Sequence, residues 1–177
     1  MPELEDSWIG ARQAWLADML ARKTGEEVWI AELRENDVHV VHHAALPDEL
    51  TRILAGDVVL PWHACAVGHA IVSGLDNPRQ DALLSAPAAR LTGLTITDPR
   101  DLRLMLAMTR ERGYAVEAHT ATLGEAGIAA PVVDSAGQIV ASIGIIGPAE
   151  RLLPAQRQET LAEAVCATAR ELWHDGS

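Results

Sequence analysis

Phenylalanine is absent from the 177 residues and tyrosine occurs once, so five tryptophans supply most of the aromatic volume. Cysteine occurs twice, at Cys65 and Cys166, which is too few for the disulfide framework of a small secreted domain. No apolar run reaches the roughly 18 residues that a membrane-spanning helix requires. The first residues, MPELEDSWIGARQ, are acidic where a secretory signal would be basic. Together these absences predict a cytoplasmic protein with no membrane partner.

Positive charge is also scarce. Lys and Arg number 14 against 25 Asp and Glu, which gives a net charge of −11. Nucleic-acid binding needs a clustered basic face, and the sequence has no stripe rich in Lys and Arg. The chain by itself is therefore not expected to bind DNA or RNA. Hydrophobic residues make up 49% of the sequence, which is enough to bury a core.

Hydrophobic periodicity divides the chain into helices and short strands. Residues 8–23 carry apolar side chains at helical spacing, and Gly25 follows the last turn. Asn77-Pro78 and Asp98-Pro99 each predict a helix start, because Asn or Asp caps a helix and Pro suits its first turn. We expect helices at 8–23, 63–74, 77–85, 99–112 and from 154 onward, and strands at 28–33, 37–44, 114–119, 127–134 and 138–146. This order predicts an α+β fold with a mainly antiparallel sheet flanked by helices.

The segment LPWHACAVGHA (60–70) concentrates reactive side chains. His63, Cys65 and His69 stand there at H-x-C-x3-H spacing. Neutral imidazole and thiolate are good zinc ligands, so one interpretation is a zinc-responsive regulatory site with His119 or Glu117 as the fourth ligand. The spacing is not one of the strong zinc signatures, so zinc remains an alternative and no cofactor is the main expectation.

A catalytic role for Cys65, with His63 as its base, is a second alternative. Nucleophilic catalysis needs a base within hydrogen-bonding reach and an oxyanion site. Residues two apart at a helix start face different directions, and a cysteine at such a place more often packs as a small hydrophobe. We therefore do not expect an enzyme. Turnover that is lost in Cys65→Ser would contradict this expectation.

Several segments resemble the effector-binding domain of the IclR-type transcriptional regulators. LPWHACAVGHA is similar to that family's L-P-x-H-A-x-x-x-G-K-A segment, and TGEEVWIAEL (24–33) resembles its lead into the domain. The other similar segments, in the family's order and at its spacing, are TITDP (95–99), RGYAVE (112–117), IAAPVVD (128–134) and GPAERL (147–152). The resemblance extends over almost all of the chain.

The resemblance implies a GAF-like effector-binding domain at 25–177, preceded by an N-terminal helix within 1–24. In the family this domain follows a DNA-binding winged helix-turn-helix domain, and nothing before Trp8 could supply one. We therefore expect either a piece of a longer regulator or a stand-alone sensor, with DNA as a partner only through the missing domain. The resemblance also implies a homodimer or a tetramer. His69 stands where the family usually has Lys, which predicts a surface position.

The resemblance also places the effector pocket. In the family the ligand lies between the helix start in A-x-x-x-G-K and the strands that follow R-G-Y. His63 matches the family's own His in L-P-x-H-A, which needs no metal to be explained. The predicted ligand-binding residues are Trp62, His63, Cys65, Ala66, Val67, Glu117, His119, Gly127, Ala129, Gly144 and Ile146.

Departures from the family pattern bear on the ligand. Many relatives carry Cys at the position of Gly127, and some carboxylate-binding relatives carry Ser at the positions of Gly144 and Ile146. Serine hydroxyls would bind an anionic head group, whereas Gly and Ile cannot. This predicts a roomier and more apolar pocket, unless the small residues merely compensate for bulky tryptophans nearby.

The expected effector is therefore an apolar or aromatic small molecule. Trp29 or Trp62 would form an aromatic wall of the pocket. Glu117 and His119 would be its polar anchors, and a basic nitrogen on the ligand could pair with Glu117. Binding of a short keto acid alone would contradict this prediction.

Overall fold

The computed structural model describes residues 8–45 and 58–173. Helices and strands alternate in blocks along the chain, as the sequence predicts. In chain order the elements are α1 (Ala11–Thr24), β1 (Glu27–Arg34), β2 (Asp37–Ala44), β3 (Val58–Pro61), a 3-10 turn at Trp62–Ala64, α2 (Ala66–Ser73), α3 (Asn77–Ser85), α4 (Pro99–Arg112), β4 (Ala115–Ala118), β5 (Glu125–Val133), β6 (Ile139–Pro148), α5 (Ala149–Leu152) and α6 (Ala155–Leu172). Among the described residues, no helix is long and apolar enough to cross a membrane.

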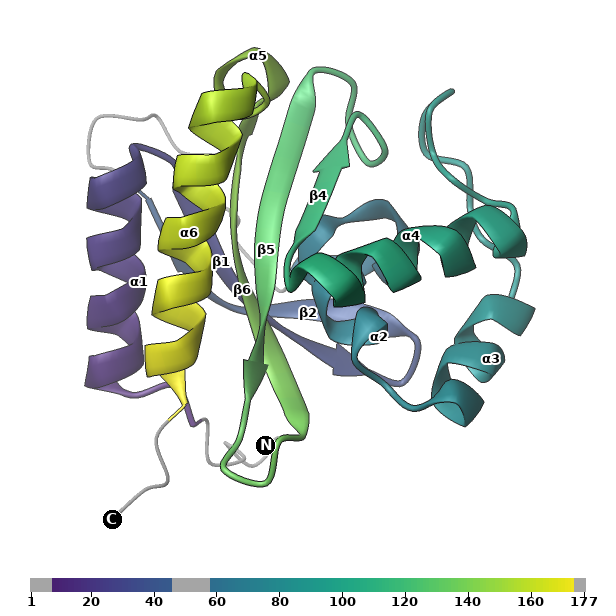
Figure 1. Cartoon of the computed structure of the whole chain (residues 1–177), viewed down its shortest axis with the longest axis horizontal. Coiled ribbons are helices and arrows are strands. Elements are labelled where there is room, and N and C mark those ends of the chain that lie inside the picture. Colours follow the sequence, from purple (N-terminus) through teal and green to yellow (C-terminus); the bar gives the residue numbers. More distant parts are fainter. Residues whose placement is uncertain (1–7, 46–57, 174–177) are drawn as a thin grey trace.

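The strands form one six-stranded sheet in the order β3-β2-β1-β6-β5-β4. Every neighbouring pair of strands is antiparallel. Figure 1 shows α1 and α6 side by side on one face of the sheet, with α2 and α4 on the other. The predicted α+β fold with a mainly antiparallel sheet is confirmed.

Two hydrophobic cores form, one on each face of the sheet. Strand β5 contributes to both, because successive side chains of a strand point to opposite faces. Ile128 and Ala130 pack with α1 and α6, whereas Ala129 packs with α2 and α4. Burial of both faces explains why this strand has a continuous apolar sequence rather than an alternating one.

The two helix starts predicted from Asn77-Pro78 and Asp98-Pro99 are confirmed, with one adjustment. The Asp98 carboxylate accepts a hydrogen bond from the Arg100 N–H at 2.8 Å, and α4 ends at Gly113 with φ +84°. Helix α3 covers the predicted 77–85, but its cap is Asp76 rather than Asn77. Asp76 accepts from the Arg79 N–H at 2.9 Å, so Asn77 takes the first helical position instead.

One strand was not predicted, and one predicted helix is wrong in its extent. Strand β3 was not expected, because its four residues are too short for a periodic signal; pairing with β2 defines it, with Leu60 opposite Val38. The helix expected at 63–74 is interrupted. A single 3-10 turn ends at Ala64, Cys65 is extended with φ −141° and ψ 147°, and α2 begins only at Ala66.

The first expected helix also begins later than predicted. Helix α1 starts at Ala11, and Trp8 lies before it. The Trp8 ring packs against Trp173 with 5.7 Å between ring centroids, and its Nε1–H donates to Glu32 Oε1 at 2.7 Å. Trp8 therefore packs against Trp173 and β1 and does not lie on a face of α1.

Close packing fixes α2 against the 3-10 turn that precedes it and against the sheet. A Cβ at Gly68 would lie 2.3 Å from the Trp62 carbonyl oxygen, and a Cβ at Gly144 would lie 3.0 Å from Val67 Cγ1. The buried Ser142 hydroxyl donates to the Val67 carbonyl at 2.9 Å and joins β6 to this helix. The start of α2 is thereby held at one edge of a cavity.

Candidate functional site

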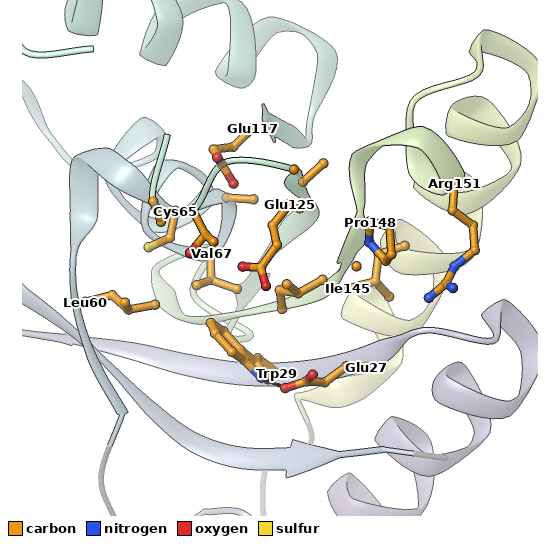
Figure 2. A pocket seen from close by; sticks show the side chains of 18 of the residues that line it. Glu27, Trp29, Leu60, Cys65, Val67, Glu117, Glu125, Ile145, Pro148 and Arg151 are labelled. Atoms are coloured by element: carbon orange, nitrogen blue, oxygen red, sulfur yellow. Dashed lines mark hydrogen bonds between the residues drawn. The ribbon is translucent and has the colours of Figure 1, made fainter. Parts of the chain in front are cut away.

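A cavity of about 770 Å³ lies between the start of α2 and the sheet (Figure 2). Strands β1, β5 and β6 form its floor, and the loop after β4 and the short helix α5 border it. Its lining residues are Glu27, Trp29, Val58, Leu60, Cys65, Ala66, Val67, Glu117, Ala121, Thr122, Leu123, Gly124, Glu125, Ala126, Gly127, Ile145, Ile146, Gly147, Pro148 and Arg151. Volumes of about 300–1,000 Å³ are typical of small-molecule sites.

One wall of the cavity is apolar. Trp29 lies on β1 and faces Val67 across the space, with Leu60 of β3 at the side (Figure 2). The Trp29 Nε1–H donates to Glu27 Oε1 at 2.6 Å, which fixes the plane of the indole ring. Trp29 is therefore the aromatic wall of the two candidates, because Trp62 is buried outside the cavity.

Two carboxylates project into the same space. Figure 2 shows Glu117, from β4, and Glu125, from β5, pointing into the cavity. Glu117 Oε1 accepts from the Thr120 N–H at 2.8 Å and from the Thr120 hydroxyl. Burial raises the pKa of the Glu117 carboxyl, although these hydrogen bonds partly oppose the shift. The site thus has an acidic side opposite its apolar wall.

The charged residues at the far end are already paired. Glu27 Oε1 lies 2.8 Å from His43 Nε2. Arg151 points away from the centre of the cavity (Figure 2), and its Nε and a terminal nitrogen each lie 2.7 Å from the carboxylate of Glu26. Arg151 is the one basic side chain among the lining residues that the structure describes.

The predicted ligand-binding residues divide into two groups. Five predicted positions are not among the lining residues: Trp62, His63, His119, Ala129 and Gly144. Six line the cavity: Cys65, Ala66, Val67, Glu117, Gly127 and Ile146.

The residues outside the cavity have structural contacts instead. His119 has φ +64°, and its Nδ1 accepts from the Gly124 N–H at 2.9 Å, so it closes the turn between β4 and β5. A Cβ at Gly144 would lie 2.8 Å from Ala129 Cβ, which leaves no room for a side chain. Close approach of β5, and of Val67 on α2 at 3.0 Å, therefore accounts for Gly144, and this position does not enlarge the cavity.

The proposed metal ligands are engaged in hydrogen bonds with the backbone. His63 Nε2 lies 2.8 Å from the Ala89 carbonyl, and His69 Nε2 lies 2.7 Å from the His63 carbonyl. His69 is 2% exposed, so its predicted surface position is wrong; burial lowers its pKa to about 4. Across residues 8–45 and 58–173, no three His, Cys, Asp or Glu side chains are grouped to hold a metal ion. Nothing in the site favours the zinc alternative.

Cys65 lacks the surroundings of a nucleophile. Its thiol is buried and faces the Pro61 carbonyl at 3.6 Å. Burial raises the pKa of the thiol to about 12, and the negative charge of Glu117 acts in the same direction. Since the thiolate is the reactive form, this cysteine is suited to packing at the cavity edge.

Sequence reasoning missed three charged residues at the cavity: Glu27, Glu125 and Arg151. The predicted strand began at residue 127, so Glu125 fell outside it. Had β5 been extended by one strand period, Glu125 would have shared a face with Gly127. No local signal marks Arg151, because only the packing of α5 against β5 and β6 brings it there.

Comparisons with known proteins agree with this architecture. The family "Bacterial transcriptional regulator IclR C-terminal" matches residues 7–174. The glycerol operon regulatory protein of Streptomyces griseus is 35% identical over 146 residues, which are 82% of this chain and 57% of that protein. This chain thus spans somewhat more than half the length of that relative.

Solved structures match over nearly the whole chain. The inducer-binding domain of the Acinetobacter transcription factor PobR, a double mutant in complex with 3-hydroxybenzoic acid, aligns with a TM-score of 0.83 at 25% identity and covers 94% of this chain and 98% of that one. The C-terminal domain of the E. coli regulator KdgR aligns with a TM-score of 0.80 at 24% identity, covering 91% and 94%. These proteins are regulators rather than enzymes. The chain belongs to the IclR family of bacterial transcriptional regulators and carries the family's C-terminal effector-binding domain.

Proposed function

We propose that this domain senses a small molecule bound in the cavity between α2 and the sheet. The observation that carries the proposal is the cavity itself, whose 770 Å³ combine an apolar wall with a few convergent polar groups. The six predicted residues that line it are proposed to contact the ligand, together with Trp29 and Glu125. The domain would occupy residues 25–177, and its role is binding without chemistry or a cofactor.

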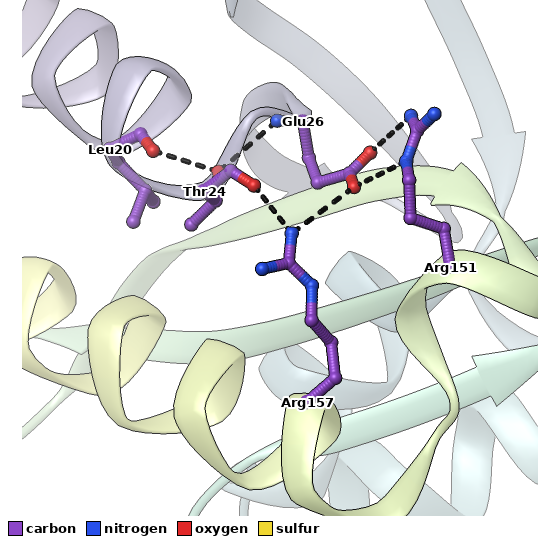
Figure 3. Close-up of polar contacts among 5 residues, drawn as sticks. All are labelled: Leu20, Thr24, Glu26, Arg151 and Arg157. Carbon is purple, nitrogen blue, oxygen red and sulfur yellow. Dashed lines mark hydrogen bonds and ion pairs between the residues drawn. The ribbon is translucent and has the colours of Figure 1, made fainter.

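A buried ion-pair cluster suggests how occupancy reaches the N-terminal helix (Figure 3). Glu26 follows the C-cap of α1, Gly25, and is 1% exposed. It is bound by Arg151, which borders the cavity, while Arg157 donates to the Thr24 carbonyl at 2.7 Å. A ligand that favours one arrangement of this cluster would shift the population of α1 orientations. In a full-length regulator, α1 would pass the change to attached winged helix-turn-helix domains.

The effector is proposed to be apolar or aromatic. Trp29, Leu60 and Val67 offer a surface for a ring or a short aliphatic chain. An aromatic ligand, 3-hydroxybenzoic acid, is bound by the similar inducer-binding domain of PobR. Another relative is named for a glycerol operon, so a small polyol is the competing candidate.

The partners of the full protein are also proposals. We propose a homodimer or a tetramer acting in the cytoplasm, with DNA contacted through the winged domains. The acidic charge of this chain, −11, suits a division in which another domain supplies the DNA-binding surface.

Native mass spectrometry of the chain, purified without chelators, tests the proposal. It reports subunit number, bound metal and retained small molecules in one measurement. We expect an organic adduct that is lost on denaturation and absent from a cavity-filled variant. A stoichiometric zinc adduct that disappears when His63 and Cys65 are replaced would instead establish the metal-responsive alternative.

A further inference from the structure

We infer that the effector of this domain is an organic cation: a protonated amine or quaternary ammonium group on a small apolar body. The inference rests on the proposed function, because it assigns a chemical class to the ligand of the same cavity. It adds the sign of the ligand's charge, which neither the fold nor the cavity volume determines.

Two carboxylates converge from neighbouring strands. Glu117 on β4 is directly opposite Gly127 on β5, and Glu125 precedes Gly127 by two residues. Side chains that are opposite or two residues apart share a face of the sheet, so both carboxylates project from the same face. Figure 2 shows them entering the cavity from that side. An ammonium group between them would have charge-assisted hydrogen-bond acceptors.

The indole of Trp29 supplies the second element. Its ring lies across the cavity from the Glu125 carboxylate (Figure 2), and its hydrogen bond to Glu27 at 2.6 Å holds it in place. A cation above the face of a tryptophan is attracted by the ring quadrupole, and tryptophan is the most favourable aromatic residue for this contact. A fixed aromatic face with carboxylates on the opposite side therefore fits an organic cation.

The same site offers little to an anion. Arg151 is the one basic lining residue among those described; it binds Glu26 through two 2.7 Å contacts and points away from the centre (Figure 2). The N-terminus of α2 at Ala66 would favour a negative group. However, the Glu117 carboxyl lies beside that helix start, because a Cβ at Gly127 would be 3.0 Å from Ala66 Cβ and 3.7 Å from Glu117 Oε2. A ligand carboxylate would enter a space that is lined by the side chains of Glu117 and Glu125.

Isothermal titration calorimetry with three compounds of one skeleton tests the inference. The compounds are 2-phenylethylamine, 2-phenylethanol and phenylacetate, which share a phenyl ring and differ in charge. We expect the amine to bind at least tenfold more tightly than the alcohol, and phenylacetate to bind most weakly. The same titrations are repeated with an Ala66→Leu variant, whose larger side chain fills the cavity. Loss of binding in this variant verifies that the compounds bind there.

Variants separate the charge effect from general effects. Glu117→Gln/Glu125→Gln keeps the side-chain shape and should remove the preference for the amine while changing alcohol affinity little. Glu159→Gln/Glu163→Gln, on the exposed side of α6, makes the same change in net charge away from the cavity and should leave the preference intact. Trp29→Leu should weaken the amine more than the alcohol, and it serves as a second test if the double variant does not fold.

The outcomes distinguish this inference from the proposed function. Phenylacetate binding in the cavity as tightly as the amine, or an amine preference that persists in Glu117→Gln/Glu125→Gln, overturns the cation inference and leaves a sensor. A retained ligand that proves neutral or anionic does the same. If none of the three compounds binds and the purified chain carries no ligand, both the inference and the proposed function are wrong.

Discussion

Glu26 and Arg151 form a two-pronged ion pair in which Nε and a terminal nitrogen of the guanidinium lie 2.7 Å from the two carboxylate oxygens (Figure 3). The pair is asymmetric, because the Glu26 side chain is 1% exposed and that of Arg151 is 45% exposed. Arg157 adds a longer contact to the same carboxylate at 3.7 Å. The stability of the junction between α1 and β1 therefore depends on keeping a buried carboxylate paired.

Arg151→Met is expected to lower the free energy of unfolding by about 3 kcal/mol, because it removes the main partner of a buried charge. Glu26→Gln should cost less, about 1–2 kcal/mol, because the partly exposed arginine regains water. Arg103→Met is the matched control: its pair with Asp81 at 2.8 Å is more than half exposed on both sides, so the loss should be within about 1 kcal/mol. Urea unfolding measures all three, and equal losses for the two arginine variants would contradict the prediction.

Ala66→Leu should abolish retention of the effector. Ala66 lies at the first position of α2 and lines the cavity, so a larger side chain takes up ligand space. Ala107→Leu, on the exposed face of α4, is the control and should retain the ligand. Native mass spectrometry of both variants reports the adduct, and a thermal melt confirms folding. An unchanged adduct in Ala66→Leu would place the effector site elsewhere.

Gly144→Phe would not serve the same purpose. A Cβ there would meet the backbone carbonyl of Ile128 at 3.0 Å as well as Ala129 Cβ at 2.8 Å. Loss of binding in such a variant would reflect displacement of the strands. A substitution at the cavity surface is therefore the informative one.

Cys65 should resist alkylation in the folded protein. Burial raises the pKa of its thiol from 9.0 to about 12, so the thiolate fraction at pH 8 falls by about a thousandfold. In a Cys166→Ala background, iodoacetamide should label Cys65 rapidly in urea and at least a hundredfold more slowly in buffer. Mass spectrometry of the labelled peptide follows both rates. Equal rates would indicate an accessible, reactive thiol and revive the catalytic interpretation.

His69 should make the domain less stable in mild acid. Burial lowers its pKa from 6.5 to about 4, so between these values the unfolded chain binds a proton that the folded chain does not. The free energy of unfolding is therefore not reduced by this group above pH 6.5. It falls as the pH drops toward 4, by about 3 kcal/mol in total for His69.

Replacement of His69 by Gln isolates that contribution. The amide of Gln can donate to the His63 carbonyl, which His69 Nε2 contacts at 2.7 Å, but it does not titrate. Urea unfolding gives the free energy of unfolding at pH 7.5 and at pH 5. Its decrease from pH 7.5 to pH 5 should be about 2 kcal/mol smaller in His69→Gln than in the unmodified protein. An identical decrease in both proteins would show that His69 is not kept neutral by folding.

Much of the fold follows from local sequence. Asp98-Pro99 and Gly113 delimit α4 as predicted, because capping and positive φ depend on a few adjacent atoms. The strand at Val58–Pro61 was missed because its formation depends on a neighbour in space. The extended backbone at Cys65 was missed for a related reason, since it is set by the junction of β3 with α2.

The candidate site was predicted less completely than the fold. The resemblance placed Ala66, Val67 and Glu117 at one location, and the structure lines a single cavity with them. It also suggested His119, whose side chain closes a turn instead. Positions in a family pattern locate a region, but side-chain direction depends on turn geometry that the pattern does not contain.

The sequence by itself determined the family, the α+β class and most helix boundaries, because these follow from short segments and from the local chemistry of caps and turns. Only the tertiary structure decided which charges meet. It buried His69, paired Arg151 with Glu26, and brought Glu117 and Glu125 to one side of Trp29. These residues come from separate elements, and their distances are set by how α2 and α5 pack on the sheet. The charge of the cavity, and hence the ligand that it can accept, is a property of that packing.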